Sequence, residues 1–172
     1  MLEKTARAVQ SHLQSDIAAQ LDAVEAYWLA QGSALTLPDP VTWLLGFHPT
    51  VVEKPREDYP IVAVTALEED PDAEICDQWG YGEGIIPVII NWFVAADTES
   101  QCNLMVWRYG EAVDRVVRSH RVLAAGIQIK ADSYIPSTDT SNPYRQAPDL
   151  GSESEFFFTQ VGMKTFKAKV RE

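Results

Sequence analysis

The densest group of side chains that could do chemistry is a run of carboxylates in residues 70–83. Asp70, Asp72 and Glu74 alternate along the chain, as the oxygen ligands of a calcium-binding loop do. Such a loop also needs a glycine at its sixth position for a sharp turn, but Ile75 stands there. Two of these carboxylates could instead act as general acid and base in a hydrolase, which would require a cleft around them. The pattern favours a solvated acidic loop.

The other chemical motifs of the sequence are weaker. His12, His48 and His120 lie far apart in the chain, and no two cysteines or histidines have the short spacing of a zinc site. The glycine-rich segment 80–84 resembles a phosphate-binding loop, but such a loop leads into a helix and this segment leads into an apolar strand. Cys102 falls on the apolar face of a predicted helix. We therefore predict no catalytic residue, no cofactor and no metal, and we do not expect an enzyme.

The elements that must position any site are clearest in the middle of the chain. An apolar strand over residues 84–96 leads to Thr98 and Gln101, whose spacing is that of a capping box at the start of a helix. The predicted helix continues to about His120, and an alternating strand follows at 126–134. Because nothing in this unit resembles a catalytic site, it indicates a scaffold.

Three further elements surround this unit. Apolar residues at steps of three and four predict an amphipathic helix over residues 5–30. Valine and isoleucine predict a strand at 59–67. In the last strand, 155–171, the apolar residues change from one alternation to the other. This change predicts a bulge near Lys164 or Thr165, or a short turn at Gly162.

Together these elements predict an α/β (α+β) fold. We expect a mixed sheet of about four strands, with two main helices packed on one face and long loops between strands. A single domain over residues 1–172 suits the length of the chain. Within it, the N-terminal helix would occupy residues 1–32 and an extended arm residues 33–58. The sheet, the second helix and two long loops would occupy residues 59–172.

Charge is divided unevenly along the chain, whose net charge is −11. Ten acidic residues lie within residues 53–83, whereas Lys164, Lys167, Lys169 and Arg171 make the last strand basic. A protein with this net charge binds nucleic-acid phosphates poorly. Opposite charges at two ends of a small domain favour head-to-tail contact between copies, unless both ends are simply solvated.

The order and character of these elements resemble the tail terminator (tail-completion) proteins of long-tailed bacteriophages. The resemblance lies in the long N-terminal helix, the extended arm, the strand at 59–64, the strand at 89–95 that runs into a helix, and the basic last strand. It implies a non-enzymatic virion protein of the tail or neck, made in the host cytoplasm. Its copies would form a ring, expected to be a hexamer, that caps the tail tube and joins it to the head connector.

The resemblance and the aromatic residues outside the predicted core together suggest where contacts lie. Residues expected to meet other subunits or partners are Trp43, Phe47, Trp79, Tyr81, Lys164, Lys167, Lys169 and Arg171. Acidic residues expected to face the lumen are Glu68, Glu69, Asp70 and Asp72. The partners would be other copies, the tail tube protein and the head-connector protein. DNA would pass through without specific binding, and no membrane contact is expected.

Three alternatives remain open on sequence alone. The chain could be another neck or head-completion protein of the same particle. It could be a small metal-dependent hydrolase that uses the acidic cluster from Asp70 to Glu83. It could also be a monomeric accessory or immunity-type module that binds one host protein through its acidic face.

Overall fold

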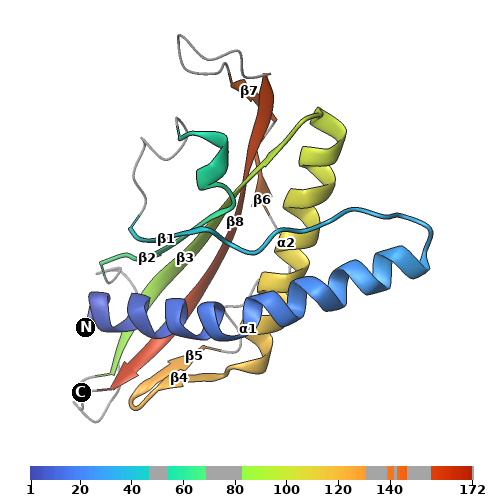
Figure 1. Cartoon of the computed structure of the whole chain (residues 1–172). Coiled ribbons are helices and arrows are strands. Elements are labelled where there is room, and N and C mark those ends of the chain that lie inside the picture. The colour runs from blue at the N-terminus through green and yellow to red at the C-terminus, as the bar shows by residue number, and fades with distance from the viewer. Residues whose placement is uncertain (47–53, 69–82, 131–138, 142, 147–155, 172) are drawn as a thin grey trace.

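The computed structural model describes residues 1–46, 54–68, 83–130, 139–141, 143–146 and 156–171 (Figure 1). In chain order its elements are α1 (Leu2–Ala30), β1 (Thr42–Leu45), a 3₁₀ helix (Arg56–Asp58), β2 (Ile61–Ala66), β3 (Glu83–Ala96), α2 (Glu99–Ser119), β4 (Val122–Ala124), β5 (Ile127–Ile129), β6 (Asp139–Thr140), β7 (Tyr144–Gln146) and β8 (Phe157–Arg171). Neither helix is apolar enough over a sufficient length to cross a bilayer, as judged from these residues.

Both predicted helices are confirmed, and their ends have local causes. In α1 the residues of one apolar stripe, among them Leu13 and Leu21, are buried. Gly32 ends this helix in a left-handed conformation, with φ at 80°, and its amide donates to the carbonyl of Leu29. Thr98 caps α2, because its hydroxyl oxygen accepts a hydrogen bond from the amide of Gln101 at 3.2 Å.

The sheet has more strands than the predicted four. Its order is β1-β2-β3-β8-β5-β4, and the short strands β6 and β7 also pair with β8. β1 and β2 are parallel, whereas every other described pair is antiparallel. The additional strands come from segments expected to be irregular. The extended arm contributes β1, and the segment after α2 contributes β4, which turns into β5 at Gly126.

β8 is continuous, so the predicted bulge or turn is wrong. Its pairing with β3 runs without interruption from Glu83 opposite Arg171 to Ala96 opposite Phe158. The change of alternation has another cause, which is that β8 packs on different faces of the sheet at its two ends. Its first residue, Phe157, belongs to a cluster on the face away from the helices, whereas Phe166 belongs to the core beneath them.

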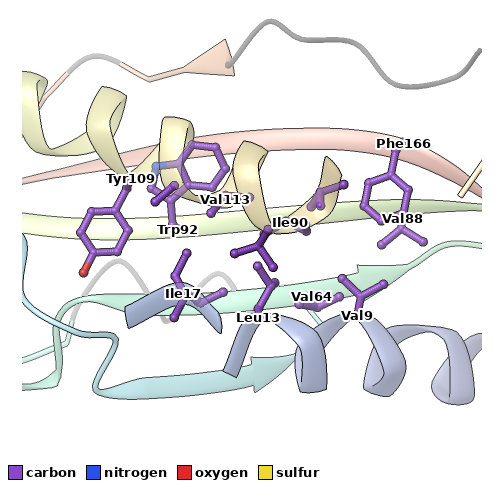
Figure 2. Packing of buried hydrophobic residues seen from close by; sticks show 14 of the residues in the cluster. Val9, Leu13, Ile17, Val64, Val88, Ile90, Trp92, Tyr109, Val113 and Phe166 are labelled. Carbon is purple, nitrogen blue, oxygen red and sulfur yellow. The ribbon is translucent and has the colours of Figure 1, made fainter. Parts of the chain in front are cut away.

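Two apolar clusters therefore lie on opposite faces of the sheet. The larger cluster is enclosed between the sheet and both helices, and Figure 2 shows Leu13 and Ile17 of α1 facing Ile90 of β3. Both helices thus pack on one face, as predicted. The smaller cluster, on the other face, comprises Tyr59, Ile61, Ala63, Phe93 and Phe157.

α1 lies between the two end strands of the sheet. The side-chain amide of Gln10 donates to the carbonyl of Leu44 in β1 at 3.3 Å, and Nε2 of His12 donates to the carbonyl of Leu123 in β4 at 2.8 Å. Successive residues of a helix are about 100° apart around its axis, so these two side chains point in nearly opposite directions. The sheet therefore curls around α1, which contacts both of its edges. Edges held in this way are less available for pairing with other chains.

Candidate interaction surfaces

One half of the sheet face away from the helices is only partly buried, and neither helix covers it. The register of β3 and β8 places alternate residues of both strands on this face. We call the following residues the open half: Ile85, Pro87, Ile89, Met163, Thr165, Lys167 and Lys169. They lie outside both apolar clusters and are half-buried or exposed. At the other end of this face, Tyr59 packs edge-on against Phe157, with ring centroids 6.2 Å apart.

The open half combines apolar side chains with cations. Lys167 is exposed and lies opposite Pro87, and Lys169 is half-buried and lies opposite Ile85. Isoleucine and methionine side chains in a half-exposed strand pair form a surface of the kind that protein partners cover. Arg171, the last residue of β8, lies opposite Glu83 in the same register.

The position of Lys164 corrects the prediction that this residue lies at an interface. Its side chain points to the helix side of β8 and is only 1% exposed. The ammonium group pairs with Oδ1 of Asp114 on α2, whose Oδ2 accepts from Nε of Arg118 at 2.7 Å. The cause is strand parity, because Lys164 shares its alternation with the core residue Phe166. Lys164 is therefore an internal cation and not a surface contact.

The structure describes only some of the other residues that were predicted to make contacts. Trp43, on β1, is half-buried and packs against the core on the helix side. Glu68 is exposed just beyond the end of β2. The other predicted contacts, Phe47, Trp79, Tyr81, Glu69, Asp70 and Asp72, lie outside the described residues.

α2 carries a second candidate surface that sequence reasoning missed. Trp107 is 57% exposed on the side of α2 that faces away from the sheet. Beside it is a shallow groove of about 430 Å³, whose described lining includes Leu104, Asn103 and Glu99. The signal was present in the sequence, because Trp107 lies away from the predicted apolar face of this helix, which carries Cys102.

A further hollow, of about 410 Å³, lies where the arm meets the start of α2. Leu35, Ala95 and Met105 contribute apolar lining, and Arg56 and Asp97 contribute charge. These two charged side chains pair with each other at the rim. Among its described lining residues, the hollow therefore offers neither a second cation for an anionic ligand nor two carboxylates for acid–base chemistry.

The described residues that could act as nucleophiles or metal ligands do not form a reactive site. Burial raises the pKa of the Cys102 thiol to about 12, which keeps it protonated at neutral pH. In the described ranges, no three His, Cys, Asp or Glu side chains gather closely enough to hold a metal ion. The acidic cluster at 70–83 lies almost wholly beyond them, so the hydrolase hypothesis stays a prediction.

No protein-family model matches this chain, and no curated protein matches it. The candidate surfaces must therefore be judged on their own geometry.

Proposed function

We propose that this chain is a non-enzymatic structural subunit that assembles with copies of itself into a ring. The observation that carries this proposal is the open half, in which Ile85, Ile89 and Met163 stand beside two lysines on a face that neither main helix covers. Half-exposed apolar residues in a regular strand pair suit a partner surface better than a solvent surface.

The positions of the two candidate surfaces favour ring formation. The open half lies on one side of the sheet, and Trp107 lies on the outer side of the helix that covers the other face. Contact between such unlike faces of two copies is head-to-tail, and a head-to-tail contact forms a ring when its rotation closes. The groove beside Trp107 includes one carboxylate, that of Glu99, which is opposite in charge to Lys167 and Lys169.

Within this proposal, the resemblance in element order supports the role of a phage tail terminator. The ring would be a hexamer that caps the tail tube and contacts the head connector. With a net charge of −11, it would let DNA pass without binding it. Another neck or head-completion protein would use the same surfaces. The hydrolase alternative rests on residues 70–83 and gains no support from the described residues.

The test is the oligomeric state of surface variants. Size-exclusion chromatography with light scattering over a range of concentrations, followed by negative-stain microscopy, should show rings for the parent chain. K167E should prevent assembly, whereas K4E makes the same charge change on exposed α1 and should not. W107A should also weaken assembly, with Y27A, an exposed aromatic of α1, as its control.

All four variants alter exposed side chains, so their free energies of unfolding should stay within about 1 kcal/mol of the parent. A parent chain that remains monomeric up to its solubility limit would refute ring self-assembly. Assembly that is equally strong in K167E and K4E would refute the role of the open half.

A further inference from the structure

The groove beside Trp107 runs along two turns of α2. Its described lining includes Glu99, Asn103, Leu104 and Trp107, which recur at helical spacing and therefore share one side of the helix. Positions four residues apart on a helix are separated by about 6 Å along its axis. A carboxylate thus stands at one end of the groove and an exposed indole ring at the other, with an amide and an apolar side chain between them.

These groups together suit a cationic side chain with an apolar stem. The face of an indole ring attracts an ammonium group, and a carboxylate pairs with it. Leu104 offers apolar surface to the methylene stem of a lysine. Within the described part of the chain Glu99 forms no ion pair, so no cation there already neutralises its carboxylate. The groove therefore fits lysine side chains of a partner.

The open half carries two lysines at a matching spacing. Lys167 and Lys169 occupy alternate positions of β8, so they lie on the same face of the sheet. Residues two apart in a strand are about 6.6 Å apart, which is close to the 6 Å between successive turns of the groove. The half-buried side chains of Ile85 and Pro87, opposite these lysines, add apolar surface for Leu104 to contact.

We propose that α2 of one copy seats on the open half of the next copy, with one of these lysines paired with Glu99 and the other on the face of the Trp107 ring. α2 is then packed between its own sheet and the sheet of its neighbour, in alternating layers of sheet and helix. The inference rests on the proposed self-assembly. It adds the groups that make the contact specific and one-way, since the groove supplies the carboxylate and the strand supplies the lysines.

The first test is cross-linking of the parent chain with a carbodiimide, which joins a carboxylate directly to an amine, followed by peptide mass spectrometry. We expect a product that joins Glu99 to Lys167 or Lys169 in the assembled fraction. This product cannot form within one chain. The two lysines lie opposite residues 85 and 87 of β3, whereas Glu99 follows the other end of that strand, roughly 30 Å away.

The second test reverses the charges and measures assembly by light scattering over a range of concentrations. E99K should raise the dissociation constant of the assembly by about five- to tenfold, because it replaces an exposed ion pair with repulsion. E3K makes the same change in the first turn of α1 and should leave assembly unchanged. One of the double variants E99K/K167E and E99K/K169E should recover assembly, because it restores opposite charges between copies. E99Q serves if E99K fails to fold.

The outcomes separate this contact from self-assembly in general. Assembly of E99K that matches that of E3K, or failure of both double variants to recover assembly, would overturn the contact between Glu99 and the lysines while self-assembly stands. Absence of any cross-link from Glu99 in an assembled parent would do the same. A parent chain that stays monomeric would refute the proposed self-assembly, and this contact with it.

Discussion

Gly162 is a position at which even a methyl side chain should damage this fold. It lies in β8 directly opposite Trp92 of β3, and the indole ring of Trp92 rests on its backbone. A Cβ at this position would lie 2.2 Å from Cε2 of Trp92 and 2.4 Å from both Cζ2 and Nε1. G162A therefore requires the ring or the strand to move by about 0.8 Å or more within a close-packed interior.

The ring has little freedom to move. Trp92 is fully buried, and its Nε1–H donates to the carbonyl of Val106 in α2 at 2.9 Å. Overpacking of a core costs about 1–3 kcal/mol. A buried indole N–H that loses its acceptor costs about 1–3 kcal/mol more. We therefore expect G162A to lower the free energy of unfolding by about 3–5 kcal/mol, a large share of the stability of a small domain.

Urea denaturation followed by circular dichroism measures this loss. The control is T165A, an exposed position of the same strand, which should change stability by less than about 1 kcal/mol. W92L removes the ring that the new methyl group meets. The double variant should therefore be more stable than the sum of the single effects by about 1 kcal/mol or more. A loss below 1 kcal/mol in G162A, or strict additivity with W92L, would refute the proposed steric conflict.

Three further predictions concern buried ionisable groups. D114A should cost about 3–4 kcal/mol because it removes the carboxylate that pairs with the buried Lys164 ammonium, whereas K164M should cost much less. Urea denaturation of both variants compares them, and equal costs would contradict the internal ion pair. Cys102 should resist iodoacetamide in the native chain and react in urea, as peptide mass spectrometry will show, and ready native labelling would refute its burial. Burial raises the pKa of Tyr59 to about 12 and also raises the pKa of Tyr109. Near pH 10 the unfolded chain loses these protons while the native chain keeps them, so stability should fall above pH 10 by up to about 1.4 kcal/mol per pH unit for each tyrosine. Urea titrations at pH 9 and 11 test this, and a Y59F variant with an unchanged slope would contradict it for Tyr59.

The long elements could be predicted because their patterns repeat over several turns or residues. The apolar stripe of α1 and the Thr98 cap of α2 each act within one segment, so no knowledge of the partner was needed. β1 and β4 could not be predicted in this way. Each has only three or four residues, and each is stabilised by a neighbouring strand and by a bond from α1. Such short strands are products of the tertiary structure.

The candidate surfaces also depend on tertiary contacts that the sequence pattern does not reveal. The basic character of the last strand could be read directly, but the side on which each cation points depends on the unbroken register with β3. A bulge at the predicted position would have placed the Lys164 side chain on the sheet face away from the helices. The parity of Lys164, shared with Phe166 and Ala168, was the available signal that it points inward. Trp107 was missed because predicted stripes direct attention to core residues, and exposed aromatics lie outside them.

The position of β8 in the sheet has a consequence for how the chain is made. This strand pairs with β3 on one side and with β5, β6 and β7 on the other, yet it follows all of them in chain order. The β1–β3 unit and the β4–β5 hairpin are therefore synthesised before the strand that unites them exists. Completion of the sheet must therefore wait until β8 has left the ribosome, although domains elsewhere often fold during synthesis. A premature stop before β8 would leave two separate fragments of sheet with unpaired inner edges, a product prone to aggregate and to be degraded.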